Sequence, residues 1–372
     1  MIYWDNNATT PLAPEVLDAM LPYLTEQYYN PSAAYGPARR VHKAMDAARE
    51  AVAALIGAHA DEIIFTSGGT ESSNTAISQF RKPLISAIEH PASLEMGGDR
   101  APVDALGRLD ASAWATLLAG HDGVSFALAN HEVGVIQDMP SLAEMASSQG
   151  LGVHVDMVQA AGKMPIAVHE VPVHFASLSA HKLHGPKGIG ALYVKRGTPW
   201  QPLLRGGHQE SNHRAGTENV AGVIGFGKAA ELALAAADDY KQLAQLRNRF
   251  EAGLRAASLD IEIHGDAAPR LPHVSHLRIK DCSAESLSLL LEPMGLICST
   301  GSACTSREAR ASHVMLAMGV DDATARGALR FSMNRLTTAA DVDAAITIIL
   351  QVVKRVKAAQ SLLTGPVMVY TP

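Results

Sequence analysis

One lysine of this chain stands in surroundings that favour chemistry. Lys182 lies between His181 and His184 in the stretch SLSAHKLHGPKGIGALYV, just before a glycine-rich apolar run. Polar crowding beside an apolar strand can lower the pKa of an amine, and a free amine can add to a carbonyl group to form a Schiff base. A surface lysine at a turn before a strand is the commoner arrangement. Lys182 alone therefore does not decide between the two interpretations.

A second candidate is the segment SGGTES, from Ser67 to Ser72. Its glycines precede Thr70 at the expected start of a helix, where exposed backbone N–H groups and the positive end of the helix dipole can hold a phosphate. It is not a Walker motif, because no Gly-Lys-Ser/Thr follows. A plain helix cap is the alternative, since Ser and Thr favour that position.

Polar side chains also follow several expected strands. Asp156 comes directly after a strand that is expected to be buried, and Gln159 follows three residues later. A carboxylate in that place can stay ionised beside the ring nitrogen of a pyridine cofactor, although a helix N-cap is the alternative. His90 also follows a strand, where a lone histidine more often has a structural role. Together, a phosphate loop, a strand-end Asp and a later Lys have the order expected of a pyridoxal phosphate enzyme.

The cysteines point to one further reactive residue. Cys282, Cys298 and Cys304 are odd in number and lack paired metal-ligand spacing, so we expect neither a disulfide framework nor a zinc site. Cys304 lies in STGSACTS, where small neighbours suit a loop that carries a reactive thiol. A buried structural cysteine is the alternative, and it is the interpretation we keep for Cys282 and Cys298.

The elements that must position these residues follow from periodicity. Short apolar runs alternate with helical patterns, which predicts a mostly parallel α/β sheet whose loops at the carboxyl ends of the strands hold the chemistry. The expected strands cover residues 62–66, 84–87, 123–129, 152–155, 175–178 and 189–194, and the expected helices cover 14–24, 37–56, 220–257 and 339–358.

The same patterns predict two domains. A large domain is expected over residues 15–254, with a long connecting helix at its end. A smaller α+β domain is expected from residues 1–14 and 255–372, and it would carry the Cys304 loop.

Composition excludes several classes of function. The chain has 372 residues, 47% hydrophobic and 18% charged, with a net charge of −6. Such a mildly acidic chain has no field to attract nucleic acid or anionic lipid. It shows neither a basic-then-apolar opening segment nor an apolar run of the ~20 residues that a membrane helix needs. We therefore expect a soluble, cytoplasmic protein.

Several segments together resemble one family. They run nearly end to end: YWDNNATTPLAPEV, TSGGTES, EHPA, HVDMVQAAGK, SAHKLHGPKGIGALYV, RAGTEN, GSACTS and LRFSMNRLTT. The chain is similar to cysteine desulfurases of the NifS/IscS type, in the class V aminotransferase branch of the fold-type I pyridoxal phosphate enzymes. The resemblance implies that family's fold, with a large domain and a smaller α+β domain.

The resemblance also implies how the cofactor, pyridoxal 5′-phosphate, would be held. Lys182 would form the Schiff base, Asp156 would face the pyridinium nitrogen, and Gln159 would bond the phenolic oxygen. His90 would stack on the ring and is a candidate for proton transfer. The phosphate would be held by Gly69, Thr70, Ser179 and His181, with Thr217 supplied by the neighbouring subunit of a homodimer.

The substrate residues follow in the same way. Arg330 would bind the carboxylate of L-cysteine, and Cys304 would take its sulfur as a persulfide, leaving L-alanine. The sulfur would then pass to an acceptor protein, such as an iron–sulfur scaffold or a sulfur relay. His131 stands where the family usually has Asn, a position that helps hold cofactor and substrate, so it bears on substrate preference or rate.

Two other interpretations stay open at this point. Ser211 and Asn212 stand where Arg and Gly are common in the family, which leaves room for a side branch with specialised partners. The chain could be another class V pyridoxal enzyme, such as a selenocysteine lyase or an aminotransferase, with Cys304 incidental. It could also be a catalytically weak scaffold that binds sulfur-carrier or iron–sulfur assembly proteins.

Overall fold

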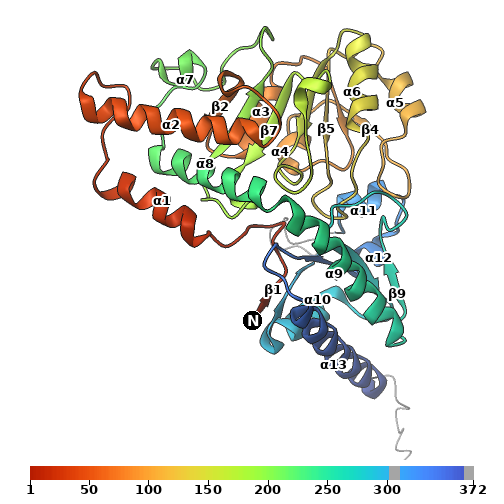
Figure 1. Ribbon diagram of the computed structural model, residues 1–372. Coiled ribbons are helices and arrows are strands. Elements are labelled where there is room, and N and C mark those ends of the chain that lie inside the picture. Colours follow the sequence, from red (N-terminus) through yellow and green to blue (C-terminus); the bar gives the residue numbers. More distant parts are fainter. Residues whose placement is uncertain (301–310, 364–372) are drawn as a thin grey trace, which may run out of the picture.

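The protein has a larger and a smaller structural unit, and the larger one is the upper one in Figure 1. The computed structural model describes residues 1–300 and 311–363. The largest group of buried apolar side chains surrounds a seven-stranded sheet. A second group gathers around Trp4, Phe250 and Phe331 next to a four-stranded sheet. The site residues predicted from the sequence belong to segments of both units.

The seven-stranded sheet confirms the predicted α/β class. Its order is β2-β8-β7-β6-β5-β3-β4, and the pairs from β7 to β4 are parallel, whereas β8 is antiparallel to both of its neighbours. The strands are β2 Ile63–Thr66, β3 Pro83–Ser86, β4 Asp99–Ala101, β5 Gly123–Ala127, β6 Gly152–Asp156, β7 Phe175–Ser179 and β8 Gly190–Val194.

The parallel strands bring their carboxyl ends to one edge of the sheet. β5 and β7 are buried along their whole length, as expected for strands covered on both faces. The residues that follow β3, β5, β6 and β7 therefore meet at that edge, which is where open α/β sheets bind their ligands.

Helices cover both faces of this sheet. The apolar stripe of α2, with Val41, Met45 and Val52, is buried, and α8 packs against both α1 and α2 (Figure 1). Gly227 of α8 allows this contact, because a Cβ there would lie 2.5 Å from Cβ of Ala48. The helices are α1 Pro14–Thr25, α2 Gly36–Ala54, α3 Gly69–Ile77, α4 Pro91–Leu94, α5 Ala111–Leu117, α6 Met139–Ser148 and α8 Val220–Ala235.

The single long helix predicted over 220–257 is wrong, because the chain bends at Ala236 into two helices. The first, α8, is apolar almost all round and is buried against the large sheet's helices. The second, α9 (Ala237–Ala256), places Tyr240, Leu243 and Phe250 in the second core. The helical pattern of the sequence continues across Ala236, which is why a single helix was predicted. The two helices nevertheless pack against different cores.

The smaller unit combines the carboxyl-terminal third of the chain with the amino-terminal strand. β1 pairs with β11, and the four-stranded sheet has the order β12-β13-β10-β9. Its elements are β1 Ile2–Tyr3, β9 Ile261–Ile263, β10 Val274–Ile279, α10 Ala284–Leu291, β11 Leu296–Ile297, β12 Ser299–Thr300, α11 His313–Ala317, α12 Asp322–Arg326, β13 Ala328–Ser332 and α13 Ala339–Leu363. The domain boundary near residue 255 stays a prediction.

The segment after β1 runs along β13, far away in sequence. Ser332 N donates to Trp4 O at 2.7 Å, and Asn6 Nδ2 donates to Ser332 O at 2.8 Å. These bonds position the segment so that Asn7 and Ala8 lie at the carboxyl edge of the large sheet.

Among the described residues, no single helix is long and apolar enough to cross a membrane. The bent pair formed by α8 and α9 passes that test only jointly, and by length and composition alone.

Candidate active site

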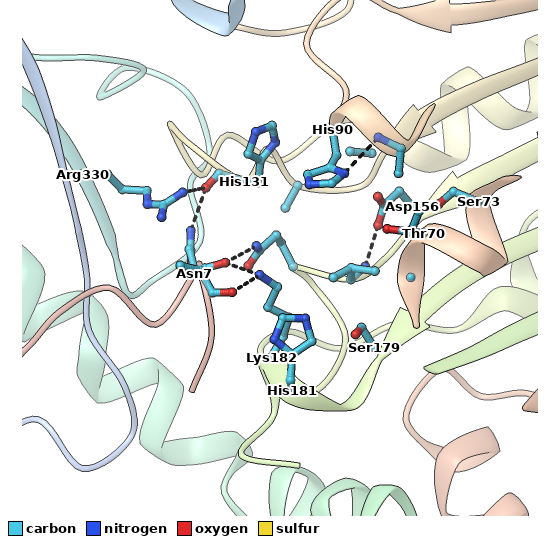
Figure 2. Close-up of a pocket in the computed structure, with 17 residues that line it drawn as sticks. Asn7, Thr70, Ser73, His90, His131, Asp156, Ser179, His181, Lys182 and Arg330 are labelled. Atoms are coloured by element: carbon cyan, nitrogen blue, oxygen red, sulfur yellow. Dashed lines mark hydrogen bonds between the residues drawn. The ribbon is translucent and has the colours of Figure 1, made fainter. Parts of the chain in front are cut away.

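A cavity of about 290 Å³ lies at the carboxyl edge of the large sheet (Figure 2). It brings together residues from opposite ends of the sequence. Most of the site residues predicted from the sequence line it: Gly69, Thr70, His90, His131, Asp156, Gln159, Ser179, His181, Lys182 and Arg330.

Lys182 reaches the centre of this cavity from the end of β7. It closes the short 3₁₀ turn Ala180–Lys182 that follows the strand directly. Its Nζ donates to the backbone carbonyl of Ala8 at 2.7 Å and also to that of Asn7 (Figure 2). The amine is therefore held by the amino-terminal segment at a fixed place in the cavity.

Asp156, the last residue of β6, lies across the cavity from Asn7. Its Oδ1 accepts the Val158 N–H at 2.8 Å. Burial raises the pKa of Asp156 to about 6, although the Val158 N–H and Lys182 act in the opposite direction. A cationic partner beside this carboxylate would favour its ionised form and offset the cost of its burial.

A second carboxyl group, Glu89, is completely buried near Asp156. Its Oε1 accepts the Ala127 N–H at 2.8 Å, whereas Oε2 has no hydrogen-bond partner among the described residues. Burial, and then the charge of Asp156, raises the pKa of Glu89 to about 8. Glu89 is thus mainly protonated at neutral pH.

The first turn of α3 forms the end of the cavity that suits an anion. Gly69 is required there, because a Cβ would lie 2.8 Å from Cγ2 of Val158. Burial lowers the pKa of His181 to about 4, and the positive charges of Lys182, Lys187 and Lys163 contribute in the same direction. The lysines that depress this pKa also create a positive region next to the helix start, which favours a phosphate.

Three histidine rings form another side of the cavity region. The ring of His131 lies between those of His90, at 5.6 Å between centroids, and His313, at 6.2 Å. Burial lowers the pKa of both His90 and His131, so both are neutral at pH 7. Nδ1 of His90 accepts the Ala92 N–H at 3.1 Å, which leaves the proton of the neutral ring on Nε2.

Gln159 connects the cavity to a buried lysine. Its Nε2 donates to Asn7 O at 3.0 Å, and its Oε1 accepts from Lys163 Nζ at 3.3 Å. Because a backbone carbonyl can only accept, Asn7 O fixes the Gln159 amide with its NH₂ toward Asn7, which lines the cavity. Burial lowers the pKa of Lys163 to about 7, with smaller effects from Lys182 and Arg330.

Arg330 of β13 lies on the side of the cavity opposite Asp156 (Figure 2). Its Nη2 donates to Asp5 Oδ1 at 2.7 Å, and its Nη1 donates to the backbone carbonyl of His131 at 2.9 Å. Its Nε is buried and has no hydrogen-bond partner among the described residues. A carboxylate entering the cavity would therefore find a planar, preorganised donor group.

Thr217, Cys282 and Cys298 do not line this cavity. Thr217 lines a smaller cavity of about 70 Å³, with Ser67 and Arg214, and not the one around Lys182. Cys304 lies outside the described residues. Cys282 is buried, whereas Cys298 is partly exposed, and burial raises the pKa of both thiols, to about 12 for Cys298.

The structure also brings to the cavity, or next to it, several residues that were not predicted from the sequence. Asn7, Ala8 and Ser73 line the cavity. Lys163 contacts the cavity residue Gln159, and Glu89 is buried near Asp156. Lys163 and Glu89 had a detectable signal, because each is a charged residue close to an expected buried strand. For Asn7 and Ala8 no local signal was available, since their role depends on contacts with β13 and Lys182.

The residues present fit pyridoxal phosphate. The raised pKa of Asp156 matches a carboxyl group placed to meet a ring cation, and the Gly69 turn beside the lysines around His181 matches an anion site. Lys182 lines the same cavity as these two features.

The chain is similar to known proteins in sequence and in fold. The aminotransferase class-V family model matches residues 2–345. A cysteine desulfurase of Cereibacter sphaeroides is 44% identical to this chain, and the match covers 96% of this chain and 97% of the relative. A solved NifS-like protein has a TM-score of 0.87 at 34% identity, covering 95% of this chain and 99% of its own. The structure of SspA in complex with cysteine has a TM-score of 0.79 at 28% identity, covering 91% and 100%.

These matches span nearly the whole chain, and the fold agrees with that of the NifS-like structure. The predicted resemblance and the predicted fold are thereby confirmed. The chain belongs to the aminotransferase class-V family and has the fold-type I architecture of its pyridoxal phosphate enzymes.

Proposed function

We propose that this protein is a cysteine desulfurase, which converts L-cysteine to L-alanine and transfers the sulfur to Cys304. The observation that carries the proposal is the convergence of Asp156, Lys182 and Arg330 on one cavity. These groups suit a pyridine ring, an amine nucleophile and a substrate carboxylate respectively. The desulfurase relative, 44% identical over nearly the whole chain, favours this reaction over a lyase or an aminotransferase.

The chain's own residues would hold the cofactor at both ends. Asp156 would pair with the ring nitrogen, Gln159 would donate its amide NH₂ to the phenolic oxygen, and the α3 start would hold the phosphate. Bound pyridoxal phosphate supplies an electron sink for bond cleavage next to the amino group of an amino acid.

Arg330 would orient the substrate. The carboxylate of L-cysteine would accept a hydrogen bond from Nε, which has no partner among the described residues, and would compete with Asp5 for the guanidinium. A two-point contact of this kind fixes the direction of the amino acid's other groups.

Lys182 and His90 are the groups placed to move protons. Lys182 Nζ would accept the proton from the α-carbon of the substrate, because it is the amine that projects into the cavity. His90 would donate from Nε2, since its Nδ1 is occupied by the Ala92 N–H.

Cys304 would complete the reaction. Its thiolate attacks the substrate sulfur, the bond between that sulfur and the β-carbon breaks, and the electron pair of that bond stays with the carbon skeleton, which gains a proton. L-Cysteine and the Cys304 thiol thus become L-alanine and a Cys304 persulfide, with no external oxidant or reductant.

A homodimer and a sulfur acceptor belong to the same proposal. Thr217 lines a separate cavity of its own chain, and we infer that it completes the phosphate site of a neighbouring subunit. The persulfide would pass to an acceptor protein that serves iron–sulfur cluster or thio-cofactor synthesis.

The test is incubation of the cofactor-loaded protein with L-cysteine. We expect L-alanine and sulfide in equal amounts under reducing conditions, and one added sulfur atom on the Cys304 peptide by mass spectrometry when reductant is omitted. Cys304→Ala should abolish sulfide release and leave the cofactor's visible absorbance intact, whereas Lys182→Arg should abolish all products.

A matched control is Cys282→Ala, which removes a buried thiol of the second core. That variant should still form the persulfide. Alanine formation without sulfur on Cys304 would contradict the mechanism, and alanine formation by Lys182→Arg would contradict the role of the amine.

A further inference from the structure

Two imidazoles and a carboxylate gather at a place that the proposed reaction does not use. One ligand atom from each of His59, Glu62 and His169 can be chosen so that all three lie within 4.8 Å of one another. His169 Nε2 is 2.7 Å from Glu62 Oε2, and the two histidine rings are 4.5 Å apart between centroids. The cluster was not foreseen, because the expectation of no zinc site rested on cysteine spacing.

The fold holds these residues in place. Glu62 is only 3% exposed, and its two oxygens accept the backbone N–H groups of His59, at 2.9 Å, and Arg196, at 3.0 Å. Its carboxylate therefore cannot turn away from the cluster without losing these bonds. Both histidine rings, in contrast, reach the surface, where an ion can approach.

The two segments that carry the cluster are also joined through their backbones. Val168 N donates to Ile56 O at 2.9 Å, next to His169 on one side and close to His59 on the other. Gly57 permits the approach, since its φ is +67° and a Cβ there would lie 3.3 Å from Ala167 Cα. The ligands are thus supported by a contact that does not depend on an ion.

The ligand types indicate which ion would bind. Two neutral imidazoles with one carboxylate are a set that Zn²⁺ takes in tetrahedral sites, with water in the fourth position. Mg²⁺ and Ca²⁺ prefer sites made of oxygen ligands only. In the cluster, an ion would replace the proton between His169 Nε2 and Glu62 Oε2, and the His59 ring would turn to become the third ligand.

This place is remote from the cavity around Lys182. Glu62 precedes β2, and His169 lies in the 3₁₀ turn Val168–Glu170 ahead of β7, whereas the cavity lies beyond the carboxyl ends of β2 and β7. The two strands run in the same direction, because β8 pairs antiparallel with each of them. The cluster and the cavity are therefore on opposite edges of the sheet, separated by at least about 13 Å, the length of a four-residue strand.

We propose that His59, Glu62 and His169 form a surface site for Zn²⁺ or a similar divalent transition metal ion, which clamps the segment before β2 to the segment before β7. The site goes beyond the proposed desulfurase function and does not depend on it. A bound ion stabilises the fold, since it binds the folded chain in preference to the unfolded one.

The test is calorimetric titration of the cofactor-loaded full chain with Zn²⁺ after removal of metals with a chelator. Cys304→Ser serves as the background, so that this thiol cannot bind zinc. We expect one ion per chain at this site, an affinity at least tenfold weaker in His169→Ala and in His59→Ala, and a Zn²⁺-dependent rise in Tm of about 2–4 °C that both variants lose.

His42→Ala is the matched control. His42 is an exposed histidine that faces a carboxylate, Asp46, at 3.7 Å, but it has no second imidazole in that pair. This variant should bind Zn²⁺ as the background does. Unchanged Zn²⁺ binding in the double variant His59→Ala/His169→Ala would overturn the proposal, and so would the absence of binding in the background protein. Both histidines are on the surface, and equal Tm values without metal would show that the variants fold.

Discussion

The two walls of the active-site cavity are built in different ways. The sheet wall consists of Thr70, His90, Asp156, Gln159 and Ser179, each of which ends or closely follows a strand of the large sheet. The closing wall consists of Asn7 and Ala8 from the amino-terminal segment and Arg330 from β13, and Asp5 pairs with Arg330. Lys182 belongs to the sheet by sequence and donates its hydrogen bonds to the closing wall (Figure 2).

The comparison shows a division of chemistry between the walls. The sheet wall offers half-buried side chains whose pKa values depart from their usual ranges, raised for Asp156 and lowered for His90. The closing wall offers backbone carbonyls and one arginine that is already paired. The sheet wall therefore suits the cofactor, which stays bound, and the closing wall suits a substrate that has to enter and leave.

The largest effect should come from the sheet wall. Asp156→Asn removes the charge that would face the cofactor's ring but keeps an oxygen for the Val158 N–H. We expect kcat for alanine formation to fall about 10²- to 10³-fold, which is typical when a preorganised electrostatic group is lost. Steady-state kinetics would measure this, and the cofactor's visible absorbance should shift. A kcat within threefold of the wild type would show that the Asp156 charge is not used.

Arg330→Ala tests the closing wall and should have the next largest effect. Loss of a buried, charge-assisted partner typically costs at least about 2 kcal/mol, so kcat/KM for L-cysteine should fall at least about 30-fold. Arg330→Lys should recover part of this loss, because it keeps the charge but not the planar donor group.

The control for this pair is Arg326→Ala, which breaks an exposed ion pair with Asp322 one turn before β13. Its kcat/KM should stay within twofold of the wild type. If Arg326→Ala and Arg330→Ala lost activity equally, the effect would lie in the stability of the small unit and not in substrate binding.

Glu89→Gln tests how the buried carboxyl group next to the sheet wall affects the pH dependence of stability. The unfolded chain loses the Glu89 proton from about pH 4.5 upward, whereas the folded chain keeps it until about pH 8. The folded state binds more protons in this range, so Glu89 makes the protein less stable as the pH rises, by at most about 1.4 kcal/mol per unit.

The measurement is urea unfolding of cofactor-free wild type and Glu89→Gln between pH 5 and pH 8. The free energy of unfolding should fall more steeply with pH in the wild type than in the variant. Parallel curves would mean that Glu89 is already ionised in the folded protein.

The smallest effect is expected from His131→Asn, which introduces the residue common in the family. Asn7 and Arg330 both bond to the backbone carbonyl of residue 131, and the substitution preserves this group. We expect kcat/KM to change less than tenfold. A larger loss would assign a role to the ring between His90 and His313, and would sharpen the boundary between the two walls.

The sheet wall could be predicted from the sequence because its residues are local to the strands. Asp156 and Lys182 each end or closely follow an apolar run, and parallel strands bring such positions to one edge. The contribution of Glu89 could not be predicted in this way. Its neighbour His90 faces the cavity, whereas Glu89 is buried near Asp156, and only the packed structure shows which side each residue takes.

The sequence by itself determined the family, the α/β sheet and the order of the residues that would hold the cofactor. These features depend on local periodicity and on motifs that stand next to strands. The tertiary structure decided the closing wall, the break between α8 and α9, and the meeting of His59 and Glu62 with His169. Each of these depends on contacts between segments far apart in the chain, which no local pattern encodes, because the free energy of such contacts comes from packing and burial in the folded state.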